Sequence, residues 1–501
     1  GTFVLRVEDT DLERSKKEYE DSQIEDLKWL GIEYDEGPDR PGDCGPYRQS
    51  ERIEIYKKYA KELVDKGLAF PCFCTDEELD AKRKKAEEEK RAPHYDGTCR
   101  DIDPEVAKAR IDKGEKFTIR FKVPKKTITV HDLIRGEVTF PDDMVGDFVI
   151  LRSNGLPVYN FCCVIDDWLM KMTHVIRAED HLPNTMRQVM IYEALGAKLP
   201  EFAHVSLLVG HDRAKLSKRH GATSVTMFRD QGYLPEAMVN YLSLLGWSHP
   251  DEKDVFSKEE LLLHFDLKRL GKAAATFDMV KLGYINGQHI KGLSSKEILK
   301  QIDKFLPKDT AFKTQDSSWQ EEFVDLFKEK VDTLPGFSSF IEDIFNSDVK
   351  DDEAFKEVLS WETTSKIKEY LINKVSEAKE EGLPFLTPEL LDEYLTTLKK
   401  EHKIKGKNLF KGTRAVLTGR AEGPDLKRFV ALTPLDVISF ANPSGIRSAP
   451  DAIVSIEEKL AFFHFFVLLI TLNIAGKINM CVGPDIMSST NVFVSNFFIL
   501  A

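Results

Sequence analysis

The sequence has few cysteines and no excess of positive charge. Only 7 of its 501 residues are cysteine, and most of these stand close together at 72–74 and 162–163. That spacing is unlike the disulfide framework of a small extracellular domain and favours a reducing compartment. With 71 basic and 84 acidic residues the formal net charge is -13, which excludes a histone-like protein that coats nucleic acid. A local basic surface for one RNA is compatible with this balance, because salt screens charges beyond about 8–10 Å.

We expect no signal peptide, and we find no solenoid-type repeat in the sequence. The sequence starts with Gly1, and residues 2–7 (TFVLRV) have the pattern of a buried strand, so we expect the chain to start inside a domain. The composition, 42% hydrophobic and 31% charged, excludes collagen-like and disordered proteins. The length predicts about three domains.

One apolar stretch, residues 460–476, approaches the length of about 20 residues that a membrane span needs. It contains His464, Thr471 and Asn473. These polar side chains favour a buried helix or a non-native tail over a membrane anchor, and no membrane contact is expected elsewhere.

The order of apolar and turn residues predicts an α/β region followed by a helical one. Strands are predicted at 117–121, 137–140, 148–151 and 204–208. Helices are predicted at about 24–30, from Ser50 as the capping residue, at 76–91 and at 184–195. Beyond 226 helical patterns dominate, including 235–245, 258–265 and 295–305. This alternation predicts a parallel sheet, interrupted by an insertion from about 70 to 140.

One cluster of three cations and one separate arginine suggest anionic ligands. Lys215, Lys218 and Arg219 lie within five residues, in the loop after the predicted strand 204–208. Phosphate is their natural partner, because lysine supplies a point charge and arginine a planar fork; a solvated basic turn is the alternative. Arg177 follows an apolar pair at a predicted strand end, where α/β enzymes place ligand groups and an arginine can clasp a carboxylate.

Two further clusters could bind ligands, one a metal ion and the other RNA. Cys72, Cys74 and Cys99 have the spacing C-x-C-x24-C, which can chelate Zn²⁺ if a fourth ligand is present; buried free thiols are the alternative. The most basic stretch, 399–414, interleaves Leu409 and Phe410 with cations. It suits either a solvated surface or a surface that binds RNA phosphates and bases.

Several segments occur in a fixed order that is typical of one family. They are residues 3–11 (FVLRVEDTD), 45–52 (GPYRQSER), 159–162 (YNFC), 166–167 (DD), 174–181 (HVIRAEDH), 215–222 (KLSKRHGA), 240–247 (NYLSLLGW), 405–407 (KGK) and 417–419 (LTG). Together they resemble the glutamyl-tRNA synthetases of bacterial and organellar type, which are class I aminoacyl-tRNA synthetases. The resemblance runs from residue 1 to about 427.

The resemblance implies an enzyme that uses ATP, with Mg²⁺ carried by the nucleotide, to form glutamyl-adenylate from L-glutamate. The glutamyl group would then pass to the 3′ end of tRNA(Glu) during protein synthesis. A monomer in a bacterial cytoplasm, a mitochondrion or a plastid is implied; a transit peptide is not observable in this sequence.

Residue roles follow from the matching positions. Arg177 would hold the side-chain carboxylate of glutamate with Tyr159 as hydroxyl partner, and Glu8 would receive the amino group. For Glu8 and Asp9 taken alone, charge pairing at a helix N-terminus is the alternative. The remaining positions are those for ATP (Asp180, His181, Leu208, Lys215 and Lys218), for catalysis (Lys215, Lys218 and Arg219), and for tRNA (Lys403, Lys405, Lys407 and Arg414).

For zinc, Asp101 occupies the fourth ligand position by alignment, with Tyr95 or His94 as substitutes. The implied fold is a Rossmann-like parallel sheet with its first strand missing, an inserted α/β domain and all-α helical domains. The expected segments are 1–70 (first catalytic part), 71–145 (inserted acceptor-stem-binding domain), 146–225 (second catalytic part), 226–310 (helical stem-contact domain), 311–430 (helical anticodon-binding domain) and 431–501 (atypical, partly apolar tail).

The sequence departs from the family at both ends. Class I synthetases carry a His-x-Gly-His signature ahead of the position of Glu8, and this sequence begins after it, so a polypeptide starting at Gly1 is expected not to aminoacylate. An incomplete gene model would explain both ends. The alternatives are a non-catalytic tRNA-binding fragment or paralogue and a glutaminyl-tRNA synthetase relative. The helical distal half disfavours the latter, which should end in β-barrels.

Overall fold

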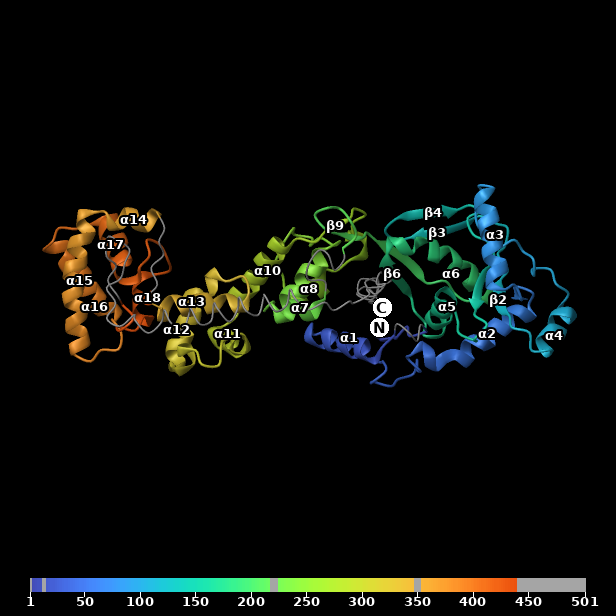
Figure 1. Cartoon of the computed structure of the whole chain (residues 1–501), viewed down its shortest axis with the longest axis horizontal. Coiled ribbons are helices and arrows are strands. Elements are labelled where there is room, and N and C mark those ends of the chain that lie inside the picture. The colour runs from blue at the N-terminus through green and yellow to red at the C-terminus, as the bar shows by residue number, and fades with distance from the viewer. Residues whose placement is uncertain (1, 11–14, 217–223, 347–352, 439–501) are drawn as a thin grey trace, which may run out of the picture. The chain divides into compact units, whose positions relative to one another are not determined.

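The computed structural model describes residues 2–10, 15–216, 224–346 and 353–438. Lys218, Arg219 and the apolar stretch 460–476 therefore lie outside the described residues. The chain divides into two compact units (Figure 1). The first comprises Gly1–Asp230 and Pro235–Leu282, and the second comprises Gln231–Leu234 and the described residues from Gly283 onward.

A four-stranded sheet lies at the centre of the first unit, in the order β4 (Gly136–Phe140), β3 (Ile128–Asp132), β7 (Glu201–Val205) and β6 (His174–Ala178). The β3–β7 and β6–β7 pairs are parallel, as expected, and β4 runs antiparallel at one edge, so the sheet is mixed. The strand expected at 204–208 is instead β7, followed by the short β8 (Leu208–Val209). Helix α6 (Leu182–Leu195) connects β6 to β7 and supplies the crossover that a parallel pair requires.

The second sheet of this unit is antiparallel and has the order β1 (Ala69–Cys72), β2 (Thr118–Phe121) and β5 (Phe148–Leu151). Two helices lie between β1 and β2 in sequence, α3 (Asp76–Glu88) and α4 (Pro104–Asp112). Thr75 and Glu78 form a capping box at the start of α3, and the Asp103 carboxylate accepts N–H bonds at the start of α4. Strands β3 and β4 fall in the segment that we expected as an insertion, yet they pair within the four-stranded sheet.

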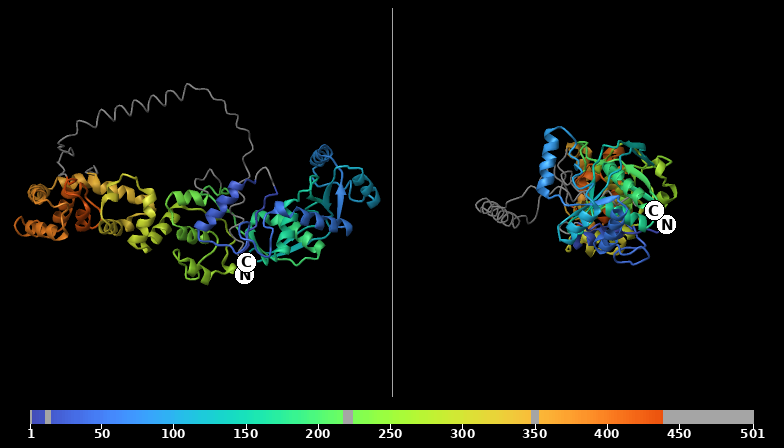
Figure 2. Two further views of the ribbon diagram at one scale, coloured as in Figure 1. Left: turned by 90° about the horizontal axis from the view of Figure 1, so that it is seen from below. Right: turned by 90° about the vertical axis from the view of Figure 1, so that its right-hand side faces the viewer.

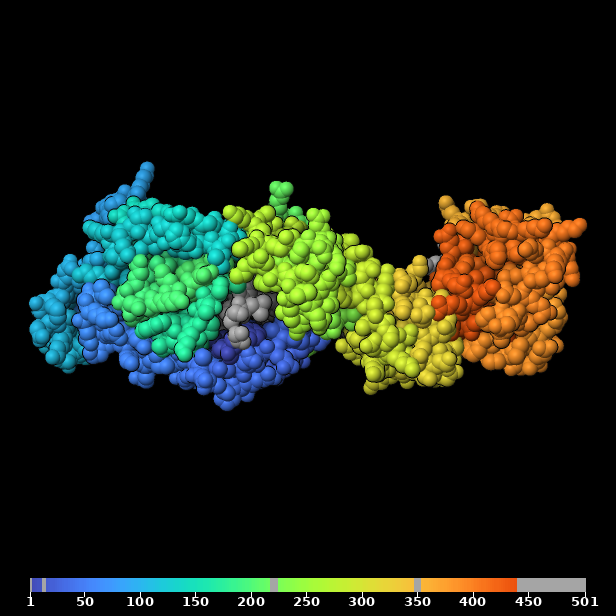
Figure 3. Space-filling model, turned by 180° about the vertical axis from the view of Figure 1, so that it is seen from behind, coloured from blue at the N-terminus to red at the C-terminus, as the bar shows by residue number. Residues whose placement is uncertain are grey.

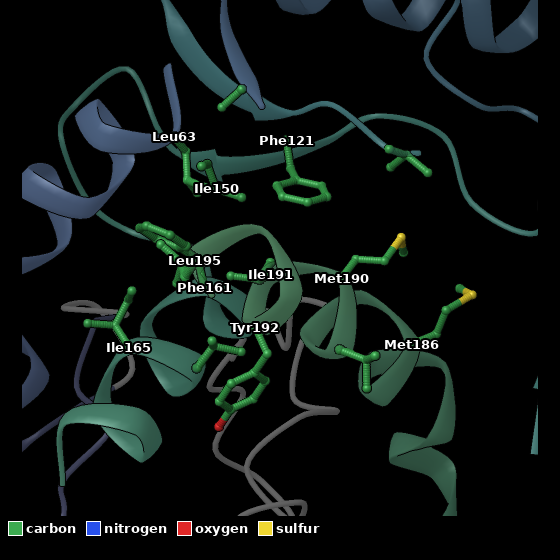
Figure 4. Close-up of a cluster of buried hydrophobic side chains, with 14 of the residues drawn as sticks. Leu63, Phe121, Ile150, Phe161, Ile165, Met186, Met190, Ile191, Tyr192 and Leu195 are labelled. Atoms are coloured by element: carbon green, nitrogen blue, oxygen red, sulfur yellow. The ribbon is translucent and has the colours of Figure 1, made fainter. Parts of the chain in front are cut away.

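One apolar cluster joins the two sheets through α2 (Ile53–Asp65), α5 (Tyr159–Leu169) and α6. Figure 4 shows Phe121 and Ile150 from the antiparallel sheet facing Met190 and Ile191 of α6. The hydroxyl of Tyr192 points away from these side chains. Burial of each large apolar side chain contributes about 1.5–3 kcal/mol, so this cluster fixes α6 against the sheets.

Two local expectations for the N-terminal region are wrong. Thr2–Val7 does not form a continuous strand: Val4 and Val7 make single parallel bridges to Glu36 and Arg48. Ser50 does not cap a helix with its own hydroxyl, because that hydroxyl donates to Asp9 (2.6 Å). The helix begins with the 3₁₀ turn Gln49–Arg52 and continues as α2.

Helix α1 (Lys17–Trp29) lies beside α7 (Val225–Asp230) within the first unit (Figures 1 and 2). The Thr226 hydroxyl donates to Asp26 (2.8 Å), and Arg229 pairs with Glu25 (2.9 Å). The unit continues with α8 (Pro235–Leu244), α9 (Lys258–His264) and β9 (Ala275–Thr276), which pairs with β8. Helix α10 (Met279–Gly292) spans the sequence boundary between the units.

The second unit is helical over its described residues. Its helices are α11 (Ser295–Ile302), α12 (Ser317–Phe327), α13 (Phe337–Phe345), α14 (Glu353–Leu359), α15 (Glu362–Glu380), α16 (Pro388–Lys400), α17 (Gly406–Thr418) and α18 (Leu426–Leu432). Ile367, Leu371, Leu391 and Val416 belong to the core that α15 to α18 share. Figure 3 shows these helices, orange to red, as one closely packed body. Among the described residues, no helix is both long and apolar enough to cross a membrane.

Candidate active site

Arg177 lies buried near the carboxyl end of β6, directly opposite His204 in the register of β6 and β7. Its Nη2 donates to Thr185 Oγ1 (2.5 Å) and Gln188 Oε1 (2.7 Å), and its Nε donates to His204 Nε2 (3.3 Å). A guanidinium has five N–H donors, so these three acceptors leave the two on Nη1. Among the described residues no carboxylate pairs with Arg177 and no hydrogen-bond partner engages Nη1. The side chain is therefore a buried cation with one nitrogen available for an anion.

His204 and Asp132 continue this arrangement across the sheet. The Asp132 carboxylate, on the last residue of β3, accepts from His204 Nδ1 (2.6 Å) and from the His204 backbone N–H (3.0 Å). It also accepts from the backbone N–H groups of Ile134 and Arg135. We did not predict a role for Asp132 or His204. The signal in the sequence is a polar residue at a buried position near the end of each strand, Asp132 in ITVHD and His204 in EFAHV.

Glu8 lies next to a second cation, Arg6, whose side chain is 12% exposed. Arg6 pairs with Glu8 (2.9 Å) and with Asp167 (2.6 Å), and the Cys163 thiol contacts Glu8 Oε1 (3.3 Å). About one third of the Glu8 side chain is exposed. Because Arg6 donates to one oxygen of Glu8, the carboxylate is held in a defined position.

Asp9 has the helix-terminal role that we weighed for this acidic pair. Its carboxylate accepts the Ser50 backbone N–H (2.8 Å) and the Ser50 hydroxyl (2.6 Å) at the start of the Gln49–Arg52 turn. Negative charge is favourable at this end of a helix. The two neighbouring carboxylates thus differ in environment: Asp9 stabilises a helix start, and Glu8 does not.

Tyr159 and His181 lie close to these charged groups. Tyr159 is the first residue of α5, and its ring centroid is 6.1 Å from that of His181. Burial raises the pKa of Tyr159, the carboxylate of Glu8 adds to the rise, and the charge of Arg177 opposes it. Burial lowers the pKa of His181, and Arg177 lowers it further. The residues expected for glutamate therefore share one electrostatic environment.

The loop that carries Lys215, Lys218 and Arg219 begins after β8. Its first part, up to residue 216, folds back as a hairpin. The Leu216 backbone N–H donates to the Leu208 carbonyl (2.9 Å), and that of Gly210 donates to the Ala214 carbonyl (2.9 Å). Lys215 Nζ forms an ion pair with Asp180 (2.8 Å), which joins two residues expected at the ATP site. The remainder of the motif, with Lys218 and Arg219, lies outside the described residues.

Four buried polar atoms near these residues have no hydrogen-bond partner among the described residues. They are Arg6 Nε, Asn160 Oδ1, Gln188 Nε2 and Tyr192 OH. Buried polar groups are normally hydrogen-bonded, and each exception calls for an explanation. A polar ligand that contacts these side chains would supply the missing partners. Sequence reasoning missed Gln188 and Tyr192, although both lie on α6 four residues apart and so share one face.

The three cysteines expected to bind zinc come together, with their sulfurs within 4.8 Å of one another. Cys74 Sγ is 3.7 Å from Cys99 Sγ, and Tyr95 OH is 3.4 Å from Cys72 Sγ and 3.6 Å from Cys74 Sγ. Tetrahedral zinc with bonds of about 2.3 Å to sulfur and 2.0–2.2 Å to oxygen places its ligands about 3.6–3.8 Å apart. The donor set formed by the cysteines and Tyr95 therefore fits this ion.

Asp101, the expected fourth ligand, does not join the cysteines. Its side chain is 83% exposed and pairs with Lys122 (3.2 Å). His94 does not join them either, because its Nε2 contacts the Asp143 carbonyl (3.1 Å). The structure thus places Tyr95, and neither Asp101 nor His94, beside the thiols.

His249, Glu260 and His264 form another compact group of possible ligands. The Asp251 backbone N–H donates to His249 Nδ1 (3.1 Å), which places the proton of the neutral ring on Nε2. A metal would have to replace the proton on Nε2, and Nδ1 would then carry a proton facing the Asp251 N–H. This group therefore does not fit a metal ion.

The basic stretch forms the loop after α16 and the start of α17. Lys403, Lys405, Lys407 and Phe410 are exposed, and Lys407 lies over the Trp361 ring (5.4 Å). Arg414 differs, because its Nη2 donates to the Pro424 carbonyl (2.5 Å) and burial lowers its pKa. The lysines and Phe410 thus form an accessible surface, to which Arg414 contributes little.

Comparisons with known proteins agree with the fold. The family described as "tRNA synthetases class I (E and Q), catalytic domain" matches residues 1–284, and the "Anticodon binding domain" matches residues 297–433. Glutamate–tRNA ligase 1 of Caldicellulosiruptor saccharolyticus is 46% identical over 86% of this chain and 89% of its own length. The chain belongs to the class I glutamate–tRNA ligase family. A second ligase of this family, from Carboxydothermus hydrogenoformans, is 43% identical over 86% of this chain and 90% of its own length.

Solved structures of the family have the same fold. A glutamate–tRNA ligase from Elizabethkingia meningosepticum, in complex with its amino acid, is 31% identical, with a TM-score of 0.77 over 87% of this chain and 91% of its own. The enzyme from Elizabethkingia anophelis gives a TM-score of 0.75 over the same shares. The expected family and fold class are therefore confirmed.

Proposed function

We propose that this ligase activates L-glutamate with ATP and transfers the glutamyl group to tRNA(Glu). The observation that carries the proposal is the buried Arg177, which has an available Nη1 and no carboxylate partner among the described residues. A buried charge is costly unless it is paired, so the side-chain carboxylate of glutamate would complete this site. Tyr159 would donate its hydroxyl to the same carboxylate, and Glu8 would pair with the ammonium group.

In the first step a carboxylate oxygen of glutamate attacks the α-phosphorus of ATP, and the bond to pyrophosphate breaks. Lys215, Lys218 and Arg219 would neutralise the phosphates, with Asp180, His181 and Leu208 lining the nucleotide site. Mg²⁺ bound to the ATP phosphates would add charge neutralisation there. Lys215 would exchange Asp180 for a phosphate; their ion pair is about half exposed, and such pairs contribute only about 0–1 kcal/mol.

In the second step a ribose hydroxyl at the 3′ end of the tRNA attacks the acyl carbon, and AMP leaves. These residues would act by positioning the reactants and stabilising charge, without a covalent enzyme intermediate. We assign residues 71–145 to the acceptor end, 226–310 to the stem and 311–430 to the anticodon. The lysines at 403, 405 and 407 would meet phosphates, whereas Arg414, which donates to the Pro424 carbonyl, would contribute little.

Zinc would be held by Cys72, Cys74, Cys99 and Tyr95, and would contribute stability to the segment that carries the cysteines. The fit of the four donor atoms to tetrahedral spacing supports this assignment. Asp101 would remain paired with Lys122.

The test is ATP–pyrophosphate exchange, in the presence of its tRNA, by the full-length protein with the family's His-x-Gly-His segment ahead of Gly1. We expect exchange that requires L-glutamate and that L-glutamine does not support. The variant Arg177→Ala should lose this activity while Asp101→Ala keeps it. Exchange with glutamine would indicate the glutaminyl alternative, and absence of exchange would contradict ligase activity.

A further inference from the structure

Three residues on adjacent parallel strands form a continuous buried row at the candidate site. Asp132 ends β3, His204 lies in β7 and Arg177 lies in β6, with Arg177 and His204 directly opposite each other. The carboxyl ends of parallel strands are where α/β enzymes bind ligands. All three side chains are buried, so water does not replace the hydrogen bonds between them.

The state of His204 follows from its partners. Asp132 is satisfied by four donors, so it is an anion that accepts the Nδ1–H of His204. His204 Nε2 is then the acceptor, and its single lone pair is shared by the Thr185 hydroxyl (2.8 Å) and, at longer range, the Arg177 Nε–H (3.3 Å). With the opposite tautomer, an N–H on Nε2 would face the N–H of Arg177.

We infer that Asp132 and His204 are positioning residues for Arg177, and that they determine the affinity for the substrate carboxylate. Asp132 selects the tautomer of His204, His204 fixes Nε of Arg177, and Thr185 and Gln188 fix Nη2. The guanidinium is left with one nitrogen that can donate, Nη1, through its two N–H groups. A carboxylate would therefore meet one nitrogen of Arg177 rather than a two-nitrogen fork. This inference rests on the proposed function of Arg177.

Three variants distinguish the hydrogen-bonding role of Asp132 and His204 from a space-filling role. In His204→Phe the ring remains but the acceptor is lost, and in Asp132→Asn the carboxylate that selects the tautomer is lost. In His204→Gln the amide oxygen can accept from Arg177 while the amide N–H donates to Asp132. We measure kcat and KM for L-glutamate and for ATP in exchange by the full-length protein, and the unfolding midpoint of every variant.

We expect His204→Phe and Asp132→Asn to raise KM for glutamate by about tenfold or more, since each disturbs a hydrogen bond to a charged group. KM for ATP should not change, and His204→Gln should stay close to wild type. The matched control is His249→Phe, which replaces another fully buried histidine of the same unit. It should lower the unfolding midpoint without a selective effect on glutamate.

Failure of the proposed function and failure of the positioning role give different results. Wild-type protein without glutamate-dependent exchange would overturn the proposed function itself. An active wild type in which His204→Phe leaves KM for glutamate unchanged, or raises both KM values alike as a merely destabilised protein would, overturns the positioning role alone. A loss in His204→Gln equal to that in His204→Phe would also overturn it, because the acceptor would then not matter.

Discussion

Arg52 Nε donates to Asp166 Oδ1 across 2.7 Å, and both side chains are almost completely buried. The same carboxylate accepts from Gln49 Nε2 (2.9 Å) and from the Tyr56 hydroxyl (2.8 Å). This network ties the start of α2 to α5, which also carries Asp167, the partner of Arg6. It therefore supports the position of the Arg6–Glu8 pair at the candidate site.

Removing Arg52 from its buried pair with Asp166 should be strongly destabilising. We expect Arg52→Met to lower the free energy of unfolding by about 3–5 kcal/mol, because the Asp166 carboxylate would stay buried without the cation that donates to it, and the next cation, Arg6 Nε, is 3.9 Å away. Denaturant unfolding measures the change. The control is Lys61→Met, since Lys61 pairs with Asp65 on the surface of the same helix and should contribute less than about 1 kcal/mol. Equal losses in the two variants would contradict the importance of burial.

Zinc content should depend on Tyr95 and not on Asp101. We expect the purified protein to contain about one zinc ion per chain by elemental analysis, in keeping with one four-ligand site. Cys74→Ala should abolish binding, and Tyr95→Phe should weaken it, because the phenol oxygen completes the donor set. Asp101→Ala should retain the ion. Retention by Tyr95→Phe together with loss by Asp101→Ala would restore Asp101 as the ligand.

Phe410 and its buried neighbour Leu409 should respond differently to truncation. The Phe410 side chain is 55% exposed between lysines, and an aromatic there can stack on an RNA base for about 1–3 kcal/mol. Phe410→Ala should weaken tRNA binding, measured by filter binding, without lowering the unfolding midpoint. Leu409→Ala should lower the free energy of unfolding by about 2–5 kcal/mol, because Leu409 is in the core. Unaltered tRNA affinity in Phe410→Ala would argue for a merely solvated surface.

Acidification should destabilise the first unit through His204. Burial lowers the pKa of His204, and Arg177 and Arg135 lower it further, although Asp132 opposes this. Below the ordinary histidine pKa of about 6.5, the unfolded chain binds a proton at His204 that the folded chain does not bind. The free energy of unfolding should therefore fall as pH drops below about 6.5. In His204→Gln this part of the slope should be absent, and an identical slope in both proteins would contradict the assignment.

Much of the architecture was predictable from local patterns. The strand predicted at 148–151 is β5, and the helix predicted at 235–245 is α8, ending one residue earlier. These elements have strong apolar periodicity, which acts over a few residues. The pattern failed at Thr2–Val7, whose partners come from two separate loops, and at Ser50, whose hydroxyl bonds to a residue 41 positions away.

By itself, the sequence determined the family, the parallel strands and the residue types at the site, because motifs and periodicity are properties of neighbouring residues. Only the tertiary structure decided which of those groups interact. Strand register placed His204 between Asp132 and Arg177, and chain folding brought Tyr95 rather than Asp101 to the thiols. The physical reason is that hydrogen bonds and metal ligation depend on distances of about 2–4 Å between atoms remote in sequence, and only packing of the whole unit sets those distances.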